Sequence, residues 1–148
     1  MKIDSELLFT ITIDKELKNG NSGRTKHFSQ AIKEKKQWVQ ALGNADVETV
    51  TGIVYPLPAF IQDVLLGSPI QQKVGIVVNR VLGKRQRMFD PDSVLRGGAK
   101  ELVDSLVMLG ILVDDNIKCV TWCVGLQDDS RKGEGPFTEV LFYDGAEA

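Results

Sequence analysis

The chain has 148 residues, of which 43% are hydrophobic and 26% are charged, and its formal net charge is −2. These values are typical of a globular domain. They exclude an intrinsically disordered chain, a collagen-like repeat and a small disulfide-stapled fold. No run of about 18 uncharged apolar residues predicts a membrane span, and the N-terminal stretch carries acids where a signal peptide has none. We therefore expect one cytoplasmic domain without a membrane partner.

Charge is distributed unevenly along the chain. Residues 1–100 carry 15 basic and 10 acidic side chains, whereas residues 101–148 carry 3 basic and 10 acidic ones. A protein with an acidic balance is not expected to coat nucleic acid non-specifically. The basic excess of the first part is nevertheless compatible with a local basic groove.

The first predicted elements are a strand, a polar loop and a helix. Residues 6–14 alternate apolar and polar side chains, which predicts a strand. Residues 17–25 are rich in Gly, Asn and Ser and predict a loop. Ser29 is a plausible N-cap for a helix over residues 30–42, which Gly43 would end. The inward face of that helix is expected to carry Ile32, Trp38, Val39 and Leu42.

Residues 52–69 form an apolar segment without a clear period. Pro56, Pro58 and Pro69 interrupt it. The pattern predicts an apolar loop, either an irregular cover on the core or a contact between two copies of the chain.

The second half of the chain adds further strands and a helix. Residues 71–82 predict a strand with a possible bulge at Gly75. Residues 99–109 predict a helix that Gly110 ends, with Leu102, Val103, Leu106 and Leu109 on one face. Residues 117–126 and 138–143 predict two strands joined by a polar turn. The expected fold class is α+β, with one mixed sheet of about four strands and two main helices.

The two cysteines are Cys119 and Cys123. On one strand they share a face at about 13 Å, which is too far for a disulfide. We expect both to be reduced core residues.

Two pairs of acids are candidates for chemistry. Pro91 holds Asp90 extended, so that the carboxylates of Asp90 and Asp92 are presented together. Like charges this close favour a bound cation, and oxygen ligands suit Mg²⁺ or Mn²⁺. A solvated turn is the alternative. The second pair is Asp114 and Asp115, which the preceding helix could bring back toward the first pair; an ordinary turn cap is the alternative.

Basic residues bracket the first acid pair. Lys84, Arg85 and Arg87 precede it, and Arg96 and Lys100 follow it. Bases that hold phosphates beside acids that hold a metal are the arrangement expected where a polyanion meets a metal ion. The alternative is a solvated charged surface.

Residues 84–120 resemble the RusA family of Holliday-junction resolvases. Their sequence is KRQRMFDPDSVLRGGAKELVDSLVMLGILVDDNIKCV. That family has a basic run, an Asp-x-Asp-Asn motif, a helix with a lysine, a glycine, a short apolar run, an Asp-Asp pair and a strand. The matching segment covers about a quarter of the chain.

The resemblance implies a RusA-like fold and a Mg²⁺-dependent endonuclease that cuts four-way DNA junctions as a homodimer. It also implies a prophage origin. It implies no small-molecule cofactor besides the metal. By position, Asp90, Asp92 and Asp115 resemble the metal-binding acids and Lys100 the essential lysine. The side chains expected to bind DNA are Lys84, Arg85, Arg87, Arg96, Arg24 and Lys26.

The chain departs from the family pattern in three respects. Ser93 stands where the family has asparagine, and extra residues around Gly97 and Gly98 precede Lys100. The pI of about 5.4 is low for the family, and the apolar segment 52–69 looks like an insertion. These departures leave two alternatives, a junction-binding module that cuts poorly and a nuclease for other branched DNA. Phe89 is expected either to act as a wedge at the junction centre or to pack beneath the acid segment.

Overall fold

Ten elements make up the fold of this computed structural model, which describes residues 3–17, 28–89 and 93–146, without the side chains of Phe28 and Arg96. In chain order they are β1 (Leu7–Ile13), α1 (Phe28–Gly43), β2 (Asp46–Thr49), β3 (Val54–Pro56), α2 (Leu57–Asp63), β4 (Val74–Val81), η2 (Leu95–Ala99), α3 (Lys100–Met108), β5 (Val120–Asp128) and β6 (Phe137–Asp144).

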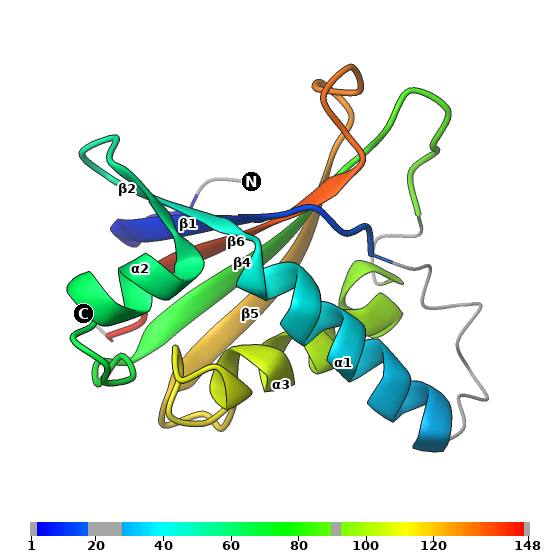
Figure 1. Ribbon diagram of the computed structural model, residues 1–148. Helices are drawn as coiled ribbons and strands as arrows, with labels where there is room; N and C mark the ends of the chain where they lie inside the picture. The colour runs from blue at the N-terminus through cyan, green and yellow to red at the C-terminus, as the bar shows by residue number, and fades with distance from the viewer. Residues whose placement is uncertain (1–2, 18–27, 90–92, 147–148) are drawn as a thin grey trace.

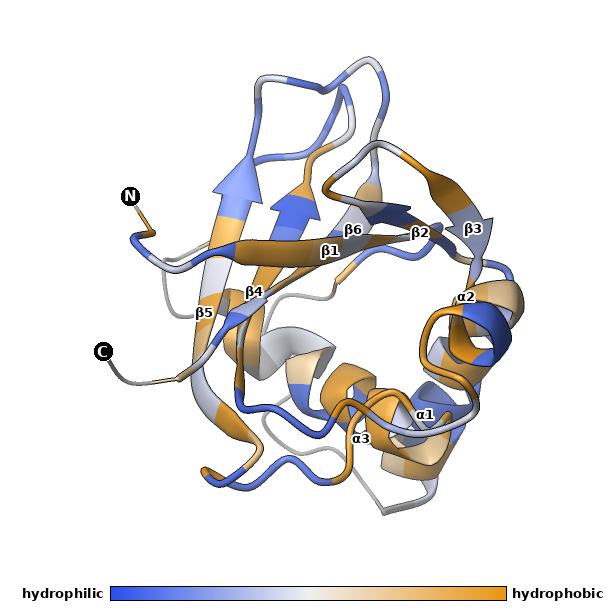
Figure 2. Ribbon diagram, turned by 90° about the vertical axis from the view of Figure 1, so that its left-hand side faces the viewer, coloured by the Kyte–Doolittle hydropathy of each residue, from blue (hydrophilic) through white to orange (hydrophobic). Residues whose placement is uncertain are grey.

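The strands form one mixed sheet in the order β3-β2-β1-β6-β4-β5. Among the described strands, only β4 and β5 pair in parallel, and every other neighbouring pair is antiparallel. Helices α1, α2 and α3 lie on the same side of the sheet (Figures 1 and 2). The α+β class is confirmed, but the expectation of about four strands is wrong, because six strands of the described residues form the sheet.

The core lies between this face of the sheet and the helices. Phe9, Ile11 and Ile13 alternate inward from β1, as the sequence pattern predicted. On α1 the buried stripe runs through Glu34, Trp38 and Leu42, four residues apart, so Ile32 lies off it and is 40% exposed. The prediction that Ile32 faces inward is therefore wrong. None of the described helices is long and apolar enough to cross a membrane.

Residues 52–69 are not an irregular loop. They contain β3 and α2, and the prolines belong to the start of that helix: Pro56 is its N-cap and Pro58 lies in its first turn. Proline is tolerated there because the first N–H groups of a helix have no intrahelical partner. Leu57 and Phe60 are buried, and the Phe60 ring lies 4.8 Å from that of Phe9. The segment thus closes one end of the core.

Strands β5 and β6 are not hairpin partners, because β4 lies between them. The pairing of β4 with β5 is shifted between Val74 and Gly75, which confirms the predicted irregularity. A Cβ atom at Gly75 would lie only 1.9 Å from the Trp122 ring, so glycine is required. Cys119 is half-buried and Cys123 is exposed, and both are free. Neither is a core residue, because Cys119 precedes β5 and Cys123 is exposed on β5, an edge strand of the described sheet.

Candidate functional site

Two loops leave the same end of the sheet. Residues 82–89 follow β4 and residues 129–136 follow β5, and because these strands are parallel, both loops begin at their carboxyl ends. Figure 1 shows the loops side by side beyond the sheet. Lys132 Nζ donates a hydrogen bond to the backbone oxygen of Gln86 at 3.2 Å, which ties one loop to the other.

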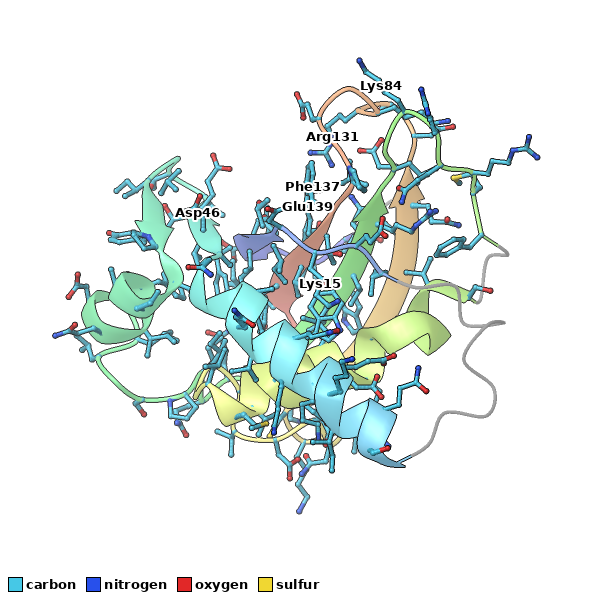
Figure 3. All side chains as sticks on the ribbon, turned by 45° about the vertical axis from the view of Figure 1, so that its right-hand side comes forward. Lys15, Asp46, Lys84, Arg131, Phe137 and Glu139 are labelled. Atoms are coloured by element: carbon cyan, nitrogen blue, oxygen red, sulfur yellow. The ribbon has the colours of Figure 1, made fainter. Side chains whose placement is uncertain are left out.

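The predicted basic residues lie at the outer surface of this end. Lys84, Arg85 and Arg87 are all exposed, and Lys84 lies at the far tip of its loop (Figure 3). Lys132 adds a fourth base from the neighbouring loop. No sequence pattern singled out Lys132, because it lies in the acidic part of the chain, residues 101–148. Only the parallel register of β4 and β5 brings it near Gln86.

Arg131 belongs to a separate ion-pair network and does not extend this basic surface. Its side chain pairs with Asp128 at 2.9 Å and with Glu139, and its guanidinium carbon lies 5.6 Å from the centre of the Phe137 ring (Figure 3). Hydrogen bonds from Ser130, with help from Arg131, lower the pKa of Asp128. The bond to Glu139 raises the pKa of Arg131. The positive charge of Arg131 is therefore already paired with the carboxylates of Asp128 and Glu139.

We call residues 82–89 the basic loop, because they include Lys84, Arg85 and Arg87. Phe89 is the last residue of this loop and lies on the face of the sheet that the helices cover. Its half-buried ring lies under the guanidinium of Arg80, with 3.5 Å between the guanidinium carbon and the ring centre. This contact favours the packing interpretation of Phe89 over the wedge interpretation.

Four of the predicted site residues lie outside the described part of the chain, namely Asp90, Asp92, Arg24 and Lys26. The side chain of Arg96 is likewise not described. Phe89 directly precedes the acid pair and Val94 follows it by two positions, and both lie against the second half of β5. Phe89 makes two hydrogen bonds with the side chain of Gln127. Val94 packs closely on Gly125, because a Cβ atom built at Gly125 would lie 3.0 Å from the Cβ atom of Val94.

Asp114 and Asp115 lie in the turn that leads into β5. Asp115 N donates to Asp114 Oδ1 at 2.7 Å, and Asn116 Nδ2 donates to Asp114 Oδ2 at 3.0 Å. A hydrogen bond with the Asp114 carboxyl raises the pKa of Asp115, with further contributions from partial burial and the charge of Asp104. Both acids are exposed, as expected for the turn cap that was the alternative interpretation.

The structure does not bring Asp115 back toward Phe89. Asp115 precedes Val120, the first residue of β5, whereas Phe89 is bonded to Gln127, seven positions along that strand. At about 3.3 Å per residue, Val120 and Gln127 are ~23 Å apart along β5. The predicted return of Asp115 toward Asp90 and Asp92 concerns residues outside the described part of the chain. Toward Phe89 there is no such return, because β5 is parallel to β4 and the chain must travel back to the amino ends of these strands before β5 can begin.

Lys100 lies at the other end of α3 from this turn. It is the exposed first residue of the helix. The extra residues noted in the sequence form η2, in which Gly97 and Gly98 leave helical geometry and Gly98 has a φ of 113°. Lys100 lies six positions after Val94 in the chain, so it is closer in sequence to the described residues beside the acid pair than Asp115 is.

Within the described ranges, no group of three or more His, Cys, Asp or Glu side chains is arranged to hold a metal ion. The Asp114 carboxylate already accepts two hydrogen bonds. A scan against models of known protein families gives no match, and a search of curated protein sequences gives no significant match.

Proposed function

We propose that this chain is a Mg²⁺-dependent endonuclease that cuts four-way DNA junctions in the cytoplasm as a homodimer. The observation that supports it most is the position of Lys84, Arg85 and Arg87. They lie exposed on a loop whose last residue, Phe89, is fixed by Gln127 directly before Asp90. Bases at the surface would hold phosphates next to carboxylates that can hold a hard cation.

The proposed division of labour follows from these positions. Asp90 and Asp92 would hold Mg²⁺, or Mn²⁺ in its place, which would supply activation of water and stabilisation of charge during phosphodiester hydrolysis. The bases of the loop would orient the DNA backbone. Lys100, at the exposed start of α3, would balance charge near the cut phosphate. Asp115 would contribute through a second copy of the chain, because ~23 Å separates its end of β5 from Phe89.

A junction-binding module that does not cut is the second candidate. The position of Asp115 favours it, because a single chain then offers only two of the three acids that the resemblance implies. Such a protein would need the bases but not the metal.

The deciding experiment is cleavage of a labelled four-way junction with Mg²⁺. A linear duplex of the same sequence and a flapped duplex serve as comparison substrates, and Asp92→Asn as the variant. We expect paired symmetric nicks near the crossover that are absent from the duplex and from Asp92→Asn.

Each other outcome has a distinct meaning. Tight junction binding without nicks supports the binding module. Preferential cutting of the flap supports a nuclease for other branched DNA. Full activity of Asp92→Asn contradicts the proposed metal site.

A further inference from the structure

Arg80 is a buried cation at the end of the core nearest the basic loop. It is 2% exposed, and burial lowers its pKa despite the charge of Glu16. Its Nη1 donates to the backbone oxygen of Arg87 and to Gln127 Oε1, both at 2.9 Å. Its Nε has no hydrogen-bond partner among the described residues. A buried guanidinium is costly, so its retention here needs a reason.

The contacts between Gln127 and Phe89 indicate why a guanidinium is buried at this position. Its Oε1 accepts a hydrogen bond from Phe89 N at 2.7 Å, and its Nε2 donates one to Phe89 O at 3.1 Å. The side-chain amide therefore pairs with both backbone groups of Phe89, as a neighbouring strand would. Arg80 orients this amide, because its guanidinium can only donate and so requires the oxygen of Gln127 on its side.

We propose that Gln127, oriented by Arg80, is a positioning residue that fixes the backbone at Phe89 and hence the point from which the chain enters Asp90. This inference rests on the proposed function, because the position matters only where the acids act. Two strands supply the constraint: Arg80 from β4 holds the carbonyl of Arg87, and Gln127 from β5 holds Phe89. Misplacement by about 1 Å is enough to slow catalysis ~100-fold.

Three variants separate positioning from general stability. Gln127→Leu removes the three hydrogen bonds of the side chain. Gln127→Glu keeps the acceptor for Arg80 and Phe89 N but loses the donor to Phe89 O. Asn79→Leu is the matched control, since Asn79 Nδ2 donates to Glu139 Oε1 at 3.0 Å between neighbouring strands without touching Phe89.

Limited digestion with trypsin is the first measurement, and it does not depend on activity. The Arg87–Met88 bond should be cut slowly in the wild type relative to the bonds after Lys84 and Arg85, since Arg80 holds the Arg87 carbonyl. The digestion ratio is the rate of cleavage after Arg87 divided by the rate after Lys84 and Arg85. Gln127→Leu should raise this ratio several-fold, Gln127→Glu should raise it less, and Asn79→Leu should leave it unchanged. An unchanged ratio in Gln127→Leu overturns the proposal.

Junction cleavage under single-turnover conditions is the second measurement. We expect Gln127→Leu to lower the rate at saturating junction about tenfold or more, to require more Mg²⁺ for half-maximal rate, and to leave the Kd for the junction within twofold. Gln127→Glu should recover part of the rate. Equal losses in Gln127→Leu and Asn79→Leu would show a merely structural role. If the wild type binds junctions without cutting, the proposed function fails and so does the effect of Gln127 on cleavage. The digestion ratio still reports whether Gln127 holds Phe89.

Discussion

At the scale of single residues, we expect two buried serines to respond differently to replacement by alanine. Ser93 and Ser105 are both fully buried. Within the described residues Ser93 Oγ has no hydrogen-bond partner, whereas Ser105 Oγ donates to Glu101 O at 2.7 Å. Ser93→Ala removes no hydrogen bond to a described residue, so it should leave the free energy of unfolding unchanged or raise it by up to about 1 kcal/mol. Ser105→Ala should lower it by about 1 kcal/mol.

Urea unfolding of both variants at neutral pH tests this pair. A loss of stability in Ser93→Ala equal to that in Ser105→Ala would show that Ser93 does make a stabilising bond. Ser93 is also where the resembled family has asparagine, so its role concerns the candidate site as well as the core.

At the scale of elements, the network that joins β5, its loop and β6 predicts a pH dependence. Hydrogen bonds from Ser130, and then Arg131, lower the pKa of Asp128 below its usual 3.8. In acid the unfolded chain therefore takes up this proton before the folded chain does, so stability is present above pH 3.8 and is lost as the pH falls below it. Asp128→Asn should be less stable than the wild type at pH 6, and the difference should shrink at pH 2.5.

Urea midpoints at the two pH values provide the measurement. Asp129→Asn, an exposed neighbour, is the matched control and should track the wild type at both. A difference between wild type and Asp128→Asn that persists undiminished at pH 2.5 would contradict the assignment.

The basic loop makes a second prediction at this scale. Replacing Lys84, Arg85 and Arg87 with alanine should weaken junction binding and flatten its salt dependence, because each lost phosphate contact lowers the slope of log K against log salt by about 0.9. The control replaces Lys33, Lys73 and Lys118, which are exposed and remove the same charge elsewhere. An equal effect in both triple variants would mean that net charge, rather than this loop, attracts the DNA.

How far the sequence predicted each element depended on its length and period. β1, α1, α3 and β6 are long enough to show their alternation or helical stripe, and their bounds agree with the patterns to within a few residues. β2 and β3 have only four and three residues, too few to show a period. α2 was missed because Pro56 and Pro58, which usually interrupt an element, here begin one.

At the scale of the whole molecule, the missing information was pairing between distant segments. The bases of residues 84–87 were identified from the sequence, and they are exposed as expected. Lys132, Gln127 and Arg80 were not identified, since only the parallel pairing of β4 with β5 places Arg80 opposite Gln127. The same pairing separates Asp115 from Phe89, which local patterns could not show.

That separation leads to a prediction about the proposed homodimer. If Asp115 of one protomer completes the site that contains Asp92 of the other, a mixed dimer of Asp92→Asn and Asp115→Asn has one site without defects and one with both. Such a dimer, purified with two different tags, should nick junctions although each variant alone is inactive. If each site lies within one chain, both sites of the mixed dimer are defective and it should not cut.

The matched control is a mixed dimer of Asp92→Asn with the double variant, which has no complete site under either arrangement. Cleavage by this control would reveal contaminating wild-type enzyme. Activity of Asp115→Asn alone would show that Asp115 is only the turn cap indicated by its bonds to Asp114 and Asn116. A monomer in sedimentation at micromolar concentration would remove the shared site. Because about 23 Å of β5 separates the end that Asp115 precedes from the end that holds Phe89, we expect the mixed dimer to cut.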